Sequence, residues 1–125
     1  MKINWTKLSS RERDAVVAEK VMGLERLSCH AGNCFYRIEI VNGKEKDFEG
    51  LAPNYTTCIK DAWMVVEKLD TTPFILERLT TYYGLKKPWN VMFVYKNKPK
   101  SGYAQTLPEA IAIASLRALG CEVLV

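Results

Sequence analysis

The sequence contains no long apolar segment. No run approaches the roughly 20 apolar residues that a membrane-spanning helix needs. The N-terminal stretch MKINWTKLSS also lacks the apolar region of a secretory signal peptide. Glycine and proline are few, at 7 and 5 of 125 residues, which argues against a disordered chain. We therefore expect a folded, cytoplasmic protein that does not associate with a membrane.

Motifs of catalysis are also missing. The chain has no glycine-rich phosphate loop, no HExxH and no GxSxG sequence. It holds a single histidine, so general acid–base chemistry would fall on His30 or on carboxylates. The acidic residues offer no catalytic pattern either, because Glu45, Asp47 and Glu49 alternate with lysines as solvated residues do. We predict a protein that is not an enzyme and that uses no cofactor.

Cysteine is scarce and partly clustered. Four cysteines in a cytoplasmic chain are expected to be thiols or metal ligands rather than disulfides. Cys29, His30 and Cys34 offer three of the four ligands of a structural zinc site, which Cys58 or Cys121 would have to complete. Adjacent residues are poorly placed to bind one ion or to form a Cys–His catalytic pair. The spacing therefore favours free thiols in a loop over a metal site.

The length and composition indicate one domain over residues 1–125. A chain of 125 residues that is 48% hydrophobic can bury a core without disulfides. Apolar periodicity and turn signals predict helices at 10–22, 55–69 and 107–119 and strands at 35–41, 44–48, 74–83 and 89–95. A helix is the alternative at 74–83, and 24–33 and 96–103 are expected to be loops. This order predicts an α+β fold, a small antiparallel β-sheet covered by about three helices in an αβα-like sandwich.

Several short signals define the ends of these elements. Ser9 with Glu12, and Thr106 with Glu109, match the capping box. Thr56 and Thr57 are candidate N-caps of the second helix, and Asn42-Gly43 predicts a hairpin turn. Gly23 and Gly120 are suited to end helices. The second helix is the most amphipathic, with a stripe that is expected to face the core, formed by Ile59, Ala62, Trp63, Val66 and Leu69.

The net charge of +4 comes from one segment. Residues 1–83 hold equal numbers of basic and acidic side chains, whereas residues 84–105 hold five lysines and no acid. Aromatic residues lie among these lysines, and a lysine can hold a phosphate while an aromatic ring stacks on a base. The candidate ligand-binding residues are Lys86, Lys87, Trp89, Tyr95, Lys96, Lys98, Lys100, Tyr103 and, from outside the segment, Tyr55. The alternative is that Trp89 and Tyr95 are core residues and that the lysines protect a sheet edge.

Three sequence segments resemble the phage ABA sandwich domain family. They are 17–23 (VAEKVMG), 55–69 with its YTT, AW and VEKL motifs, and 108–120 with PEAI and ALG. The resemblance covers nearly the whole chain in the family's order. It implies the fold of a small protein from tailed phages and prophages, mostly of Firmicutes, but it implies little about activity. Many members carry several Cys and His residues after the first helix, and this chain keeps only Cys29, His30 and Cys34.

These observations lead us to expect a phage protein that binds a small anionic nucleotide in the host cytoplasm. Such a protein would sequester a cyclic-nucleotide or ADP-ribose-type signal of the host's antiviral defence, and we expect it to be a homo-oligomer with ligands at subunit interfaces. The alternative is a protein that inhibits or modulates a host protein by direct contact. DNA or RNA binding ranks last, because the net charge is modest and no predicted helix carries a basic stripe.

Overall fold

A computed structural model describes residues 1–31, 33–38, 48–69, 73–79 and 87–125. These residues form three α-helices, one short 3₁₀ helix and eight β-strands. None of the helices in this part of the chain combines the length and the apolar character that a membrane crossing requires. In chain order the elements are β1 (Lys2–Asn4), η1 (Trp5–Lys7), α1 (Ser10–Lys20), β2 (Arg26–His30), β3 (Asn33–Ile38), β4 (Phe48–Leu51), α2 (Ile59–Lys68), β5 (Phe74–Arg78), β6 (Trp89–Tyr95), β7 (Lys98–Ala104), α3 (Leu107–Ala118) and β8 (Glu122–Leu124).

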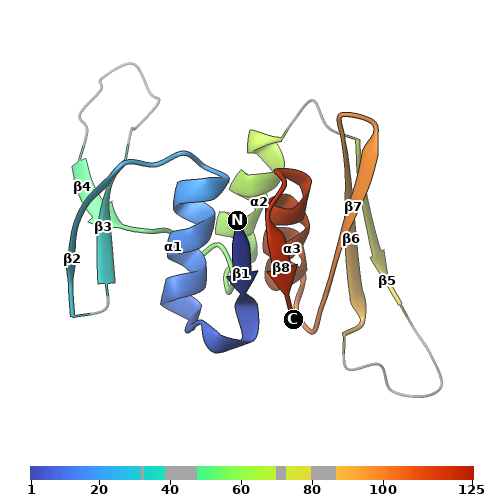
Figure 1. The fold of residues 1–125 in the computed structure, drawn as a ribbon, viewed down its shortest axis with the longest axis horizontal. Helices are drawn as coiled ribbons and strands as arrows, with labels where there is room; N and C mark the ends of the chain where they lie inside the picture. Colours follow the sequence, from blue (N-terminus) through green and yellow to red (C-terminus); the bar gives the residue numbers. More distant parts are fainter. Residues whose placement is uncertain (32, 39–47, 70–72, 80–86) are drawn as a thin grey trace.

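Two antiparallel sheets lie on opposite sides of the helices (Figure 1). The β2–β3–β4 sheet lies beyond α1, and the β5–β6–β7 sheet lies beyond α3. Between them, β1 and β8 form a parallel pair that joins the two ends of the chain. The α+β class with small antiparallel sheets is confirmed. The layering differs from a single sheet covered by helices, because here the helices fill the space between two sheets.

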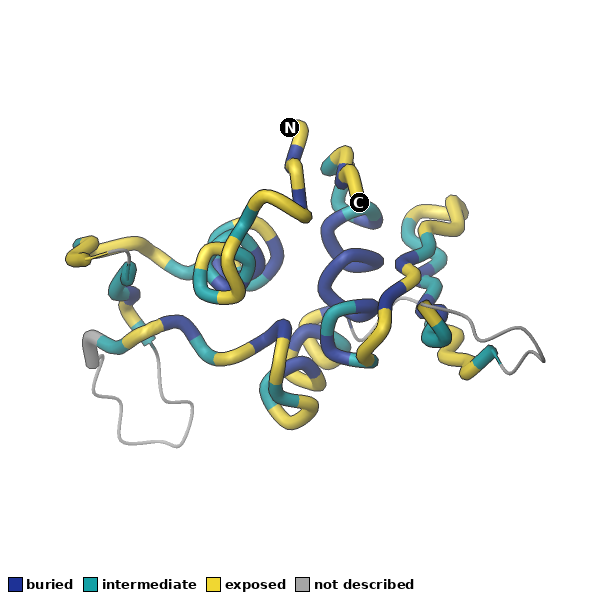
Figure 2. The backbone as a smooth tube through the Cα atoms, turned by 90° about the horizontal axis from the view of Figure 1, so that it is seen from below, coloured by how far each residue is buried: buried dark blue, intermediate teal, exposed yellow. Residues whose placement is uncertain are grey.

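The centre of the core is α3. Nine of its twelve residues are buried, and most of these are alanine or isoleucine (Figure 2). Small side chains let β7 approach closely, most of all at Gly102. A Cβ atom built on Gly102 would lie 2.5 Å from the carbonyl oxygen of Ala110 and 2.6 Å from the backbone nitrogen of Ala114. The sheet and α3 therefore pack backbone to backbone, which fixes the position of β7.

Most predicted helices are confirmed, with changes at their ends. In α1, Ser9 and Glu12 form the predicted capping box. The predicted start of α2 at residue 55 is wrong. The helix begins at Ile59, its N-cap is Cys58, and no side chain caps it. The predicted capping box at Thr106 is also absent, because Glu109 binds Trp5 and Arg13 instead.

The buried face of α2 differs from the predicted stripe. Ala62, Val65 and Leu69 are buried, whereas the side chains of Ile59 and Trp63 are 49% and 44% exposed. The helix is rotated relative to the prediction because it packs on α3 through its small and β-branched residues. The two largest apolar side chains of the predicted stripe consequently face away from the core.

Two segments predicted as loops, and the C-terminal residues for which no element was predicted, contain strands. Residues 24–33 contain β2, residues 96–103 contain most of β7, and residues 121–125 contain β8. Neither β2 nor β7 has the apolar alternation of a strand, and each is held by its antiparallel partner, β3 or β6. The region 74–83 is a strand over Phe74–Arg78. The predicted Asn42-Gly43 turn lies outside the described residues, although β4 pairs antiparallel with β3 as a hairpin requires.

The prediction of free thiols at Cys29 and Cys34 is wrong. These residues are direct partners in the β2–β3 register, and their sulfur atoms form a disulfide. Cross-strand pairing, rather than sequence spacing, brings them together. Cys58 and Cys121 are free. Within the described residues, no group of three or more His, Cys, Asp and Glu side chains is placed to hold a metal ion.

The β2–β3 hairpin is also bound to α1 through one carboxylate. Glu19 accepts hydrogen bonds from Arg26 at 2.5 Å and from the Tyr36 hydroxyl at 2.7 Å. Burial of the Tyr36 side chain, together with the neighbouring Glu19 carboxylate, raises the pKa of Tyr36 to about 12. Tyr36 therefore remains a neutral hydrogen-bond donor throughout the physiological range, and the hairpin stays attached to α1.

The substitution Gly102→Ala should destabilise the fold strongly. The added methyl group would overlap the α3 backbone, so the free energy of unfolding should fall by about 3 kcal/mol as β7 and α3 move apart. Urea denaturation measures the change. Lys98→Ala, at an exposed position of the same strand, serves as the control and should change stability by less than about 0.5 kcal/mol. Equal stability of the two variants would contradict the close packing.

Candidate functional site

The fold separates the predicted ligand-binding residues into two groups. Lys87 precedes β6, whereas Lys96 and Lys98 lie at the β6–β7 turn beyond the other end of the strand. Seven residues of extended chain span about 20 Å, so these lysines cannot contact one small ligand within a single subunit. Lys86 lies outside the described residues.

The predicted aromatic residues differ in what they can offer a ligand. Trp89 is half-buried beneath the Arg78 guanidinium, which lies 5.2 Å from the ring centroid. Tyr95 is also half-buried, with the Lys96 ammonium 5.4 Å from its ring. Tyr103 is 44% exposed and remains available. For Trp89 and Tyr95 the structure thus agrees with the alternative, in which they pack against the core.

Tyr55 cannot contact a ligand in this structure. Its side chain is only 1% exposed and belongs to the hydrophobic core. Burial, with a smaller effect of the Asp61 carboxylate, raises the pKa of Tyr55 well above its ordinary value. The preceding Pro53–Asn54 segment and the buried Asp14 hold this part of the chain in place, since Asp14 accepts hydrogen bonds from the backbone and hydroxyl of Thr56. Tyr55 is therefore a structural residue.

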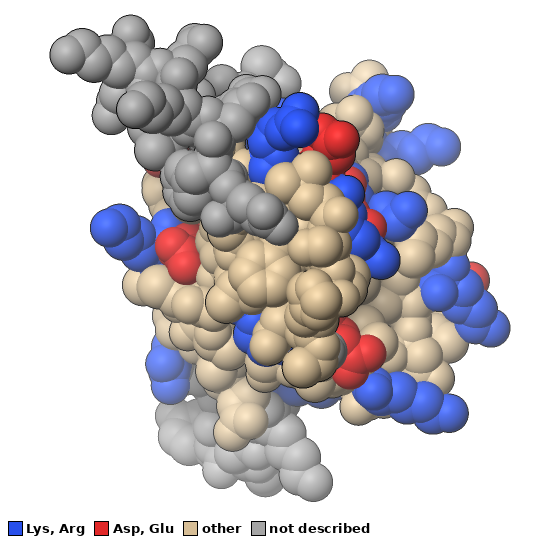
Figure 3. All heavy atoms as spheres, turned by 90° about the vertical axis from the view of Figure 1, so that its left-hand side faces the viewer, with Lys and Arg blue, Asp and Glu red and all other residues tan. Residues whose placement is uncertain are grey.

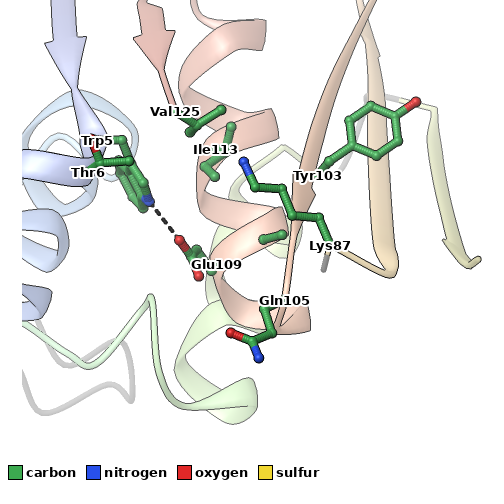
Figure 4. Close-up of a pocket in the computed structure, with 9 residues that line it drawn as sticks. Trp5, Thr6, Lys87, Tyr103, Gln105, Glu109, Ile113 and Val125 are labelled. Carbon is green, nitrogen blue, oxygen red and sulfur yellow. Dashed lines mark hydrogen bonds between the residues drawn. The ribbon is translucent and has the colours of Figure 1, made fainter. Parts of the chain in front are cut away.

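Lys87 and Tyr103 line the same cleft, which we call the Trp5–Tyr103 cleft (Figure 4). The cleft lies between η1, the end of β7 and the first half of α3, and its volume is about 280 Å³. This volume is just below the range of about 300–1,000 Å³ that is typical of small-molecule sites. The Lys87 side chain extends toward Ile113 and Val125, whereas the Tyr103 ring points away from Trp5 (Figure 4). The lining residues are Trp5, Thr6, Lys87, Tyr103, Ala104, Gln105, Glu109, Ile113 and Val125.

One wall of the cleft is held by a network around Glu109. The Trp5 indole N–H donates to the Glu109 carboxylate at 2.9 Å, and Arg13 reaches the same oxygen at 3.4 Å. Arg13 also donates to the Trp5 carbonyl and lies 5.0 Å from the Trp5 ring centroid. Because Arg13 pairs with Glu109, this carboxylate repels an anion less than a free one would. Among the described residues that line the cleft, Lys87 is the one that supplies an unpaired positive charge.

Lys100 lies in a second hollow, at the other end of α3. This hollow has a volume of about 340 Å³ and is also lined by Arg117, Gly120 and Glu122. Arg117 donates to the carbonyl oxygens of Ser101 and Val123, so its guanidinium joins β7 to β8. No aromatic side chain lines this hollow. It offers positive charge without a surface on which a base could stack.

On the opposite side of the molecule, the basic residues that the structure describes do not form a patch. On the face that carries β2–β4, lysine and arginine side chains are spread around the rim, and several have an acidic neighbour (Figure 3). Two of these arginines are paired with acids, Arg26 with Glu19 and Arg37 with Glu25. The candidate ligand site is therefore the Trp5–Tyr103 cleft.

Several cleft residues were not predicted from the sequence. Trp5, Thr6 and Val125 reach the cleft through the pairing of β1 with β8, which brings together residues separated by most of the chain. Gln105 was not among the predicted site residues, yet its amide is the group in the cleft best suited to the edge of a base. Its position, one residue before the Thr106 N-cap of α3, was the available signal.

The fold and the sequence together define the family. The family model described as "Phage ABA sandwich domain" matches residues 15–116, and the chain belongs to this family. A crystal structure of a phage protein from Bacillus cereus ATCC 14579 is similar, with a TM-score of 0.67 and 26% sequence identity. The similarity covers 94% of this chain and 93% of the Bacillus protein. No curated protein matches the chain.

Replacing Glu109 tests the wall of the cleft. Glu109→Ala removes the acceptor of the buried Trp5 N–H, so the free energy of unfolding should fall by about 1–3 kcal/mol. Glu109→Gln keeps an acceptor oxygen and loses only the partly exposed ion pair with Arg13, so it should cost less than about 1 kcal/mol. Urea denaturation followed by tryptophan fluorescence measures both. Identical losses would mean that the hydrogen bond contributes nothing.

Proposed function

We propose that this phage protein is a non-enzymatic binding protein for a small anionic nucleotide. In the host cytoplasm it would sequester a cyclic-nucleotide or ADP-ribose-type signal produced by the antiviral defence of the host. Membership of a phage family gives the biological context. The observation that carries the proposal is that Lys87 and Tyr103, both from the acid-free segment, line one cleft with Gln105.

Each of these residues suits a different part of a nucleotide. The exposed Lys87 ammonium can hold a phosphate, and the Tyr103 ring, which points out of the cleft at its rim, has a free face for a base or a sugar that extends beyond the cleft. Gln105 and Thr6 offer donors and acceptors to the polar edges of the ligand. The acid in the cleft, Glu109, is paired with Arg13 and Trp5. We infer a site for one phosphate and one base at a time in each subunit.

A larger signal would need more than one subunit. The cleft is small and has one unpaired lysine, whereas a cyclic dinucleotide or cyclic ADP-ribose carries two phosphates. A homo-oligomer would bring a second subunit's lysines to the same ligand. We therefore propose that the protein is a homo-oligomer.

Calorimetric titration tests the proposal with a panel of cyclic dinucleotides, cyclic trinucleotides and cyclic ADP-ribose. At least one should bind, and Lys87→Ala should weaken it by about 10- to 100-fold, because a charge-assisted hydrogen bond to phosphate is lost. Lys20→Ala is the matched control: it removes the same charge from an exposed position on α1 that does not line the cleft, and it should leave the affinity unchanged. No heat with any member of the panel, or equal effects of the two variants, would overturn the proposal.

A second function, direct modulation of a host protein, is favoured by a different surface. The outer side of the β5–β6–β7 sheet carries no described helix (Figure 1). Ile75 and Tyr103 on this side are 50% and 44% exposed, and Met92 lies next to Ile75 in the register. An uncovered apolar sheet surface of this kind is typical of protein contacts.

The two functions separate experimentally. If a host protein binds the sheet surface, Ile75→Lys should abolish its co-purification with the tagged protein, and added nucleotides should have no effect. Lys87→Ala should leave that contact intact, because Lys87 lies in the cleft. Co-purification that survives Ile75→Lys would contradict this second function.

A further inference from the structure

Among the described helices, the large apolar side chains that are exposed all belong to α2. Ile59, Trp63 and Met64 are 49%, 44% and 42% exposed, and with Lys60 and Glu67 they line a shallow hollow of about 480 Å³. On a helix of 3.6 residues per turn, these five positions fall on one side. We call them the α2 face.

The α2 face is held in a fixed shape. The Trp63 ring packs edge-on against Phe74 of β5, with centroids 6.1 Å apart and planes at 86°. Phe74 in turn packs against the buried Phe93, 5.2 Å away. Leu76, which shares a side of β5 with Phe74, is 38% exposed and extends the apolar surface beyond the helix. An apolar surface that is already ordered loses little conformational entropy when a partner covers it.

The order of residues on the α2 face makes it complementary to itself. Trp63 and Met64 occupy its centre, Lys60 lies three residues before Trp63, and Glu67 lies three residues after Met64. Lys60 and Glu67 of one chain are about 10 Å apart along the helix, so they do not pair with each other. If two copies of α2 cross antiparallel about a two-fold axis, Trp63 faces Met64 of the second copy. Lys60 then faces the second copy's Glu67 at each end.

We propose that α2 is the interface of a homodimer, in which a second copy of this chain covers Trp63 and Met64. Two-fold symmetry makes the contact isologous, so both Lys–Glu pairs form at once. The sulfur of Met64 against the indole of Trp63 is a favourable contact at each side of the axis. Two short helices bury less area than a standard stable interface, so Leu76 of β5 is expected to contribute. The dimer should therefore dissociate on dilution.

The α2 dimer would be the contact between subunits of the homo-oligomer in the proposed function, but it does not depend on nucleotide binding. The α2 face is distinct from the Trp5–Tyr103 cleft, since the two share no lining residue. Tests of the dimer are therefore made without nucleotide. A failure of nucleotide binding leaves the α2 dimer standing, whereas a failure of the α2 dimer leaves the cleft in place but removes this location for the second subunit of the proposed function.

Charge reversal tests the antiparallel pairing. The single variants Lys60→Glu and Glu67→Lys each place like charges opposite one another at both ends, and each should weaken the dimer by about tenfold or more. The double variant, with both substitutions, restores two opposite-charge pairs and should return the dissociation constant to within about threefold of the original. Sedimentation velocity over a concentration series up to about 100 μM, in low salt, measures these constants.

Mixing the two single variants is the decisive measurement. One chain then carries acids at both positions and the other carries bases, so an antiparallel contact yields a heterodimer from two weakly associating proteins. Native mass spectrometry with one variant isotopically labelled detects it. Thermal denaturation of each variant checks that it is folded. A wild-type protein that remains monomeric at the highest concentration, or single variants that dimerise as strongly as wild type, would overturn the proposal.

Discussion

The packing of β7 on α3 is the contact on which the rest of the structure depends. Because Gly102 has no side chain, the sheet lies against the helix backbone, and α3 becomes buried on nearly all sides. α2 and β8 pack on α3 as well, and β1 is held in turn by β8. Small residues in one helix therefore allow a chain of 125 residues to assemble two separate sheets around a single core.

The elements with strong local signals could be predicted from the sequence. α1 has a capping box, α2 has clear apolar periodicity, α3 has a proline in its first turn, and β6 is a short apolar run; each is found close to its expected place. β2, β7 and β8 could not be predicted, because their strand conformation depends on partners elsewhere in the chain. The orientation of α2 was wrong for the same reason: its periodicity shows that one side is apolar, whereas contact with α3 determines which apolar residues are buried.

In the candidate site, too, features that depend on local sequence could be predicted, whereas contacts between distant parts of the chain could not. The sequence identified the basic segment and two residues that line the cleft, Lys87 and Tyr103. The predicted strand at 89–95 already separated Lys87 from Lys96, but the sequence did not indicate that residues 98–104 would pair with it as β7 and place Lys100 in a second hollow. It also gave no sign that Trp5 would meet Glu109, because that contact spans nearly the whole chain. A positive segment in sequence thus becomes two dispersed positive regions in space.

The parallel pairing of β1 with β8 has a consequence for how the protein matures. On the ribosome, residues 2–4 emerge well before their partners at 122–124. During most of translation the Trp5 indole consequently lacks its final surroundings, and the cleft that it borders cannot exist. Residues 2–4 thus reach their native position only after more than a hundred later residues have been made. Until then, a partly made chain lacks the complete Trp5–Tyr103 cleft.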